Sequence, residues 1–281
     1  MALIRILGGI IAAPLMFVAL TSHAQEAEAD PIGSLDWTIG PATVSVPGGA
    51  QFEVPEGFAF LDADETVKFQ EINQNIPGNR QTVFAPLNLE WFALFEFEDT
   101  GYIQDNEEID ADAILEGIRE SQREANEELK KRGWATMTID GWSYNPRYDP
   151  ESNRLEWALT ATSHPTGQKV VNFNTRILGR RGVMKVTLVT EPVHLEADVP
   201  GFKAALAGFG FLPDEQYAAF REGDKVAAYG LGALILGGAA AAGAKSGLLK
   251  SVGKFILFGV LALFAGLWSR IKGLFGSKKA E

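Results

Sequence analysis

Two apolar stretches near the C-terminus constrain this chain more than any other feature of its sequence. Residues 226–244 are almost wholly Gly, Ala, Leu and Ile, and residues 252–269 form a second, largely apolar run. A soluble helix normally keeps a polar stripe for water, and neither run has one. About 20 apolar residues span a bilayer, so the first run is long enough and the second, interrupted at Lys254, is marginal. We predict that residues 226–281 form an anchor in the lipid bilayer.

The number of membrane crossings depends on where the basic residues of this anchor lie. Three lysines between residues 245 and 254 separate the two runs, and four cations follow the second run. A two-helix hairpin leaves those four outside, whereas a single crossing keeps all seven on the cytoplasmic side, where basic residues are normally retained. We predict the hairpin and keep the single crossing as the alternative. Small residues four apart, at Ala233, Gly237 and Ala241, suit either a hairpin or a homo-oligomer.

The N-terminus has the order of a secretory signal. Arg5 is followed by an apolar run from Ile6 to Leu20 and by the small-residue pattern Ser22-His23-Ala24. This run is shorter than a membrane-spanning helix, which favours a cleaved signal over an uncleaved anchor. We predict that residues 1–24 are removed and that the mature chain begins at Gln25.

The region between the two ends is strongly acidic. Residues 25–225 contain 17 Lys and Arg against 35 Asp and Glu, whereas residues 226–281 contain 7 against 1. Basic residues beside apolar helices stay in the cytoplasm, so the acidic region is the exported part. We predict a bacterial inner-membrane protein whose domain, residues 25–225, lies in the periplasm. Its negative charge argues against binding to nucleic acid.

The acidic region has the pattern of one α+β domain. Strand-like runs bounded by Pro and Gly alternate apolar and polar residues, which predicts a mostly antiparallel sheet with one buried and one polar face. The longest predicted helix runs from Asp110 to Arg132, and shorter helices are expected near residues 64–73 and 199–207. The predicted fold is an α+β sandwich. The expected strands cover residues 43–46, 51–54, 82–85, 91–97, 136–142, 154–162, 169–178, 183–190 and 208–212.

Several strings of this sequence carry a family resemblance. They are Trp91–Tyr102, residues 124–128, residues 132–134, Asn172–Gly182 and Gly223–Gly230. The chain resembles the membrane-anchored bacterial proteins of domain of unknown function 2167 over nearly its whole mature length. The resemblance implies a location at the membrane and no assigned activity or site residue. The final order of strand, strand, helix and strand is also similar to the sandwich fold of the photosystem extrinsic protein and the nuclear import factor Mog.

The polar residues around one predicted hairpin form the candidate binding site. Gly179 and Gly182 allow a tight turn with Arg180 and Arg181 at its tip, pointing into water. On the entering strand, Asn172, Asn174 and Arg176 share one face, and Lys185 and Thr187 of the returning strand share that face with them. Guanidinium groups offer paired donors, so these residues suit an anionic ligand or peptide. A polar sheet face that balances the acidic charge is the simpler interpretation.

Other chemistry has weaker support in the sequence. A calcium site at Glu98, Asp99, Asp105 and Asp110 is conceivable, but the spacing does not fit an EF-hand, and a solvated acidic loop explains it as well. The chain has no cysteine and no common nucleotide-binding or hydrolase motif, so we expect no cofactor and no structural zinc.

Two functions remain for the domain. The first is a binding or scaffolding module, held at the membrane, that recognises an envelope protein or peptide. The alternative is an envelope enzyme resembling a hydrolase, whose residues meet only in the folded chain. A shallow polar face favours the first, and a deep cleft with a perturbed carboxylate pair favours the second. We favour the binding module.

Overall fold

The computed structural model describes residues 31–73, 77–131, 133 and 135–237 of the chain. The predicted signal peptide, the run 252–269 and the end of the run 226–244 lie outside this described part. Within it, no helix combines the length and the apolar character that crossing a membrane requires.

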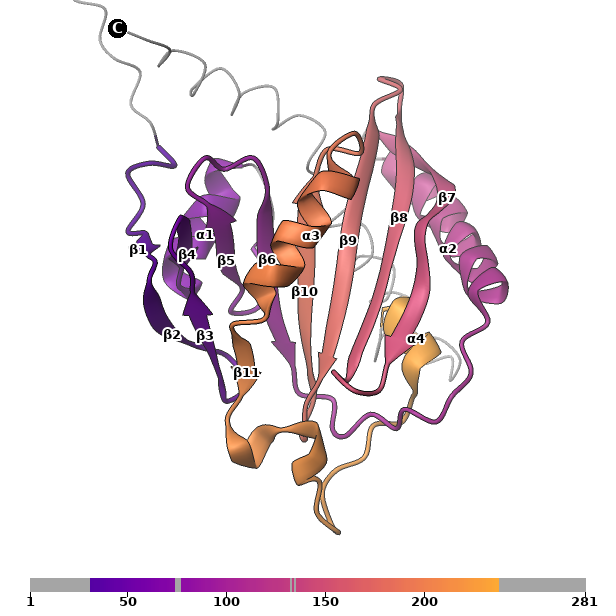
Figure 1. Ribbon diagram of the computed structural model, residues 1–281. Coiled ribbons are helices and arrows are strands. Elements are labelled where there is room, and N and C mark those ends of the chain that lie inside the picture. The colour runs from indigo at the N-terminus through magenta and orange to yellow at the C-terminus, as the bar shows by residue number, and fades with distance from the viewer. Residues whose placement is uncertain (1–30, 74–76, 132, 134, 238–281) are drawn as a thin grey trace, which may run out of the picture. The chain divides into compact units, whose positions relative to one another are not determined.

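A large antiparallel sheet organises the described residues (Figure 1). Every pairing between its neighbouring strands is antiparallel, which confirms the predicted α+β class. A smaller sheet has the order β11 (Phe209–Phe211), β3 (Ala50–Val54) and β2 (Ala42–Val46). The large sheet has the order β1 (Thr38–Ile39), β4 (Phe58–Leu61), β5 (Thr82–Pro86), β6 (Phe92–Glu98), β10 (Val183–Thr190), β9 (Lys169–Leu178), β8 (Arg154–His164) and β7 (Thr136–Asp149).

The front face of the large sheet, which carries Phe95 and Phe173, packs against the small sheet and α3 (Leu195–Leu206). Figure 1 shows α3 crossing in front of β9 and β10. Aromatic side chains fill this layer: Phe52 of β3 lies 4.7 Å from Phe84, centroid to centroid, and Phe202 of α3 lies 6.2 Å from Phe173. Edge-to-face packing of this kind adds to the burial energy of the rings.

The back face of the large sheet carries two separate apolar clusters. Helix α1 (Ala63–Ile72) covers the first, in which Phe69 packs on Phe92 of β6. Helices α2 (Ala111–Lys131) and α4 (Leu231–Ile235) cover the second, over β7, β8 and β9. The prediction of one buried and one polar face is therefore wrong, because the chain supplies helices to both sides of the sheet.

Local sequence explains how the back-face helices begin. Asp62 accepts hydrogen bonds from the backbone N–H groups of Asp64 and Glu65, and Asp110 accepts one from Ala113. These contacts satisfy donors that the first helical turn leaves without partners. Helix α2 therefore starts next to the predicted capping residue.

The C-terminal part of the domain differs most from expectation. Helix α3 begins four residues before the predicted start at 199, and η1 (Pro213–Glu215) and η2 (Tyr217–Ala219) follow β11. Helix α4 lies inside the first apolar run, yet Leu231, Leu234 and Ile235 are buried in the back cluster. The folded domain therefore continues past the expected border at residue 225, to at least Ile235.

Leu234 provides a test of this packing. Leu234 is 2% exposed, so Leu234→Ala should leave a cavity and lower the free energy of unfolding by about 2–5 kcal/mol in urea denaturation. Leu212→Ala, at a side chain that is 42% exposed, is the control and should change it by less than about 0.5 kcal/mol. Equal effects of the two substitutions would mean that α4 does not pack in the core.

Candidate functional site

A strip of polar side chains crosses the back face between its two apolar clusters. The register places Lys185 opposite Arg176 and Thr187 opposite Asn174, so these side chains share one face, as the sequence predicts. We call the following set the polar strip: Glu96 and Glu98 of β6, Lys185 and Thr187 of β10, and Asn172, Asn174 and Arg176 of β9.

The acidic half of the polar strip neutralises Lys185. The ammonium of Lys185 lies 2.9 Å from a carboxylate oxygen of Glu96 and 3.6 Å from one of Glu98. Glu96 also accepts a hydrogen bond from Gln81, which in turn accepts one from Gln70 of α1. This network links α1 to the centre of the sheet and leaves Lys185 well paired.

Arg176 is bound much less completely. Its guanidinium lies 4.7 Å from the centroid of the Trp157 ring and donates one hydrogen bond, 3.2 Å long, to the backbone carbonyl of Thr175. Among the described residues it forms no ion pair, although a guanidinium has five N–H donors. Burial lowers the pKa of Arg176 to about 10, while Glu98 and Glu96 oppose this shift. Arg176 is therefore a half-buried cation, and most of its N–H donors have no acceptor among the described residues.

The neighbouring amides are more fully engaged. Asn174 donates to the backbone carbonyl of Asn172 at 3.2 Å and accepts from the hydroxyl of Thr187 at 3.2 Å. Asn172 itself is buried. These contacts fix the strip around Arg176, so the guanidinium is the group best able to receive a ligand.

Arg180 and Arg181 do not belong to this strip. Arg180 forms a bidentate pair with Asp224, with both N–O distances at 2.7 Å, and its side chain is 13% exposed. Arg181 pairs with Glu215 at 2.6 Å and is 51% exposed. The expectation that both arginines point into water is therefore wrong for Arg180. The physical reason is that residues 213–224 fold back onto the hairpin and bring carboxylates to it.

These pairs are part of a larger attachment, which we call the C-terminal clasp: residues 213–227 held against the β9–β10 turn and the end of β6. Its backbone bonds run from Tyr102 to the carbonyl of Lys225 and from Ala227 to that of Tyr102, each 2.8 Å long. Beside them, Gly101 donates to the carbonyl of Arg181 in the turn, also at 2.8 Å. Three of the strings that carry the family resemblance, Trp91–Tyr102, Asn172–Gly182 and Gly223–Gly230, thus meet at one end of the sheet.

Gly101 has a specific role in this attachment. Its φ of +94° is a conformation that side-chain-bearing residues rarely adopt, and a Cβ there would lie 2.6 Å from the carbonyl oxygen of Lys225. Only glycine allows the two backbone segments to approach so closely.

Three of the four carboxylates of the expected calcium site have separate partners. Glu98 faces Lys185, Asp105 accepts the hydroxyl of Tyr148 at 2.8 Å, and Asp110 caps α2. Asp99 is exposed and contributes its backbone carbonyl to Lys225. No group of three His, Cys, Asp or Glu side chains in the described part of the chain is placed to hold a metal.

Sequence reasoning missed three residues of these sites: Trp157, Glu96 and Asp224. Glu96 had a signal, since it is the one charged residue in the predicted strand 91–97. Trp157 stacks on Arg176 only because β8 and β9 pair in one register, and Asp224 lies 44 residues from its partner. No local pattern indicates either contact.

The Arg180–Asp224 pair predicts a pH dependence of stability. The hydrogen bonds from Arg180 lower the pKa of Asp224 to about 2, from about 3.9 in an unfolded chain. A carboxyl with a depressed pKa stabilises the fold above the unfolded value and loses this effect as the pH falls through the folded value. The difference in unfolding free energy between the natural protein and Asp224→Asn should be constant above about pH 5 and vanish between about pH 4 and 2.

Urea denaturation at a series of pH values measures this difference. Asp214→Asn is the matched control, because the Asp214 side chain is 82% exposed and its pair with Arg221 lies at the surface. A difference for Asp224→Asn that is independent of pH, or no larger than that for Asp214→Asn, would contradict the assignment.

Comparisons with known proteins place the chain in a family. A family model described as "Protein of unknown function (DUF2167)" matches residues 38–268, which include the sheet, the clasp and α4. No curated protein matches the chain. Among solved structures, the chain is similar to cyanobacterial PsbP (CyanoP) from Synechocystis sp. PCC 6803, with 12% identity, 63% of this chain and 92% of that chain covered, and a TM-score of 0.36. The chain belongs to the DUF2167 family of proteins of unknown function.

Proposed function

We propose that this protein is a membrane-tethered binding domain of the bacterial envelope, exposed to the periplasm, which recognises an anionic group of an envelope protein or peptide at its polar strip. The observation that carries the proposal is Arg176, a half-buried guanidinium that no carboxylate of the described residues pairs.

The surroundings of Arg176 support a recognition role. Burying a cation without an ion pair costs free energy, and such groups concentrate at functional sites. The stack on Trp157 orients the guanidinium plane, and the contact with Thr175 occupies only one donor. A carboxylate or phosphate would gain paired, charge-assisted hydrogen bonds on reaching it.

The charges around Arg176 keep it cationic. Lys185 stands directly across from Arg176 on the neighbouring strand and is paired with Glu96 and Glu98. The same two carboxylates oppose the lowering of the Arg176 pKa by burial. Arg176 therefore remains a cation at neutral pH, and an anionic group of a partner would be attracted to it.

The C-terminal clasp supports the tethered arrangement. It fastens the residues immediately before the apolar run to the end of the sheet, and α4 continues from there into the back cluster. A chain attached in this way would hold the domain in a defined orientation on its anchor rather than at the end of a loose linker.

Arg176→Met provides the test of the binding site, since it keeps an apolar side chain of similar length and removes the guanidinium group. We expect the melting temperature to stay the same or rise, because the desolvated charge is gone. We expect capture of a partner, by crosslinking in intact membranes, to fall about 30-fold, as for the loss of about 2 kcal/mol at an interface arginine.

Arg123→Met is the matched control, since Arg123 is 63% exposed on α2 and pairs only with the exposed Glu116. Capture of the partner by the Arg123→Met variant should be the same as by the natural protein. Equal capture by the two variants would remove Arg176 from the binding site, and a large fall in melting temperature of Arg176→Met would make Arg176 a structural residue.

A chain that ends at Gly237 tests the tether separately. It keeps the clasp and α4, so the domain should fold and appear in the soluble periplasmic fraction, whereas the full chain should stay with membranes after alkaline carbonate extraction. Circular dichroism of both proteins checks the fold. Sedimentation of the shortened chain with membranes would show that the attachment lies in the domain itself.

A further inference from the structure

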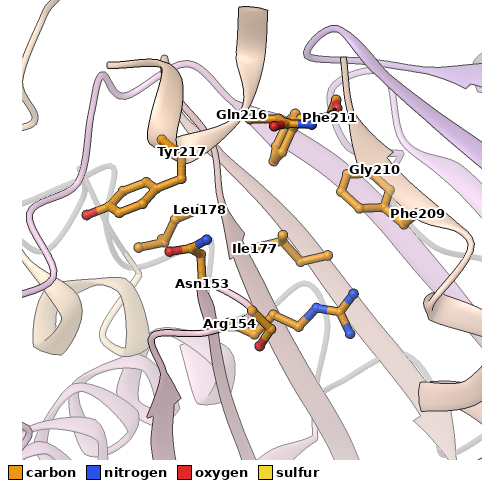
Figure 2. A pocket seen from close by; sticks show the side chains of 11 residues that line it. Asn153, Arg154, Ile177, Leu178, Phe209, Gly210, Phe211, Gln216 and Tyr217 are labelled. Atoms are coloured by element: carbon orange, nitrogen blue, oxygen red, sulfur yellow. Dashed lines mark hydrogen bonds between the residues drawn. The ribbon is translucent and has the colours of Figure 1, made fainter. Parts of the chain in front are cut away.

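A pocket on the front side of the sheet holds a second arginine, Arg154, with which no described residue forms an ion pair. It has a volume of about 210 Å³ and lies between the ends of β8 and β9, strand β11 and the turns η1 and η2. Figure 2 shows Asn153 and Arg154 on one side of it, with Phe211, Gln216 and Tyr217 on the other. The register puts Arg154 opposite Ile177, so this pocket and the polar strip lie on opposite faces of the sheet.

The nearest carboxylates are already engaged by other groups. Asp149, opposite Arg154 in the β7–β8 pairing, accepts the backbone N–H of Glu151 at 3.1 Å and the hydroxyl of Ser152 at 2.6 Å. Glu156, two residues along the strand, pairs with Lys203 of α3. Neither carboxylate is within ion-pair distance of Arg154 in the described part of the chain.

The Arg154 guanidinium is therefore both desolvated and unpaired. Its Nε is buried and donates to no acceptor among the described residues. Burial lowers the pKa of Arg154, while Glu156 and Asp149 oppose the shift from a distance. Buried donors without acceptors are rare in folded proteins, and each one costs free energy. Arg154 therefore costs the fold free energy and is not explained by a structural ion pair among the described residues.

Apolar side chains line the pocket beside Arg154, together with the polar Asn153 and Gln216. Ile177, Phe209 and Phe211 supply its hydrophobic surface. The adjoining turn is held by the bond from the N–H of Leu178 to the carbonyl of Asn153, 2.9 Å long. A cavity of about 150 Å³ is known to hold benzene, so a volume of about 210 Å³ admits a phenyl ring with a short chain.

We propose that this pocket binds a carboxylate attached to a small apolar body, with the carboxylate on the Arg154 guanidinium and the body against Ile177, Phe209 and Phe211. The two terminal Nη groups of the guanidinium offer paired donors that match the two oxygens of a carboxylate. The ligand is either a free aromatic or aliphatic acid or the C-terminal residue of a peptide, since both present the same group.

Isothermal titration calorimetry of the full chain in lipid nanodiscs at pH 7 tests the proposal, with 3-phenylpropionate as the probe and 3-phenylpropanamide as its neutral counterpart. We expect the acid to bind the natural protein at least about tenfold more tightly than the amide does, because the charged contact is worth about 1.4 kcal/mol or more. Equal binding of acid and amide, or no binding of either, would overturn the proposal.

Variants separate Arg154 from general charge effects. Arg154→Met should abolish the preference for the acid. Arg154→Lys should retain a weakened preference, since lysine keeps the positive charge but lacks the paired N–H donors of the guanidinium. Arg147→Met, at an exposed arginine on β7, should bind the acid as the natural protein does. An unchanged preference in Arg154→Met would show that another cation receives the carboxylate, contrary to the proposal.

A second pair of probes identifies the source of the carboxylate. The tripeptide Gly-Gly-Phe and its C-terminal amide are titrated in the same way. Tighter binding of the tripeptide than of 3-phenylpropionate assigns the pocket to peptide C-termini, and the reverse order assigns it to free acids. Failure of Arg176→Met to reduce partner capture would leave these results unaffected, because the two sites are on different faces.

Discussion

The pairing of β10 with β6 is the contact on which the rest of the structure depends. In the large sheet, strands β1, β4, β5 and β6 and strands β7 to β9 come from separate parts of the chain, and β10 joins them by pairing with β6 on one side and β9 on the other. Without β10, the large sheet would be divided into two halves. The apolar side chains beside the dividing edge would lose their neighbours on the other half. Because side chains alternate, its register also decides which residues face forward and which face back.

The same register creates the unusual electrostatics of the back face. It sets Lys185 beside Glu96 on one neighbour and opposite Arg176 on the other, so one cation is paired and the other is not. A sheet selected for stability alone would place an apolar residue or a carboxylate at one of these positions. Arg154 on the front face repeats the pattern, since its neighbouring carboxylates have other partners.

The sequence predicts the elements of this fold better than their contacts. Alternation along residues 154–178 correctly separates Phe173 from Asn174, and the capping pattern at Asp110 correctly starts α2. Strand β4 was missed because its four apolar residues, buried or half-buried on both sides, do not alternate. Helix α4 was missed because the composition of a Gly- and Ala-rich run predicts a membrane-spanning segment. Adjacent arginines in one turn give no pattern that distinguishes the buried Arg180 from the exposed Arg181, since the distant Asp224 makes that difference.

The course of the chain from β11 to α4 bears on the order in which the protein assembles. Strand β11 lies on the front side and α4 on the back, so the clasp carries the chain around the end of the sheet. Its binding surface consists of the β9–β10 turn and the end of β6, which exist only after β10 has paired with both neighbours. The clasp and α4 are also the last of the described residues to leave the ribosome. Closure of the back cluster by α4 is therefore a late step, and until then an apolar surface over β8 and β9 stays open to other binding partners.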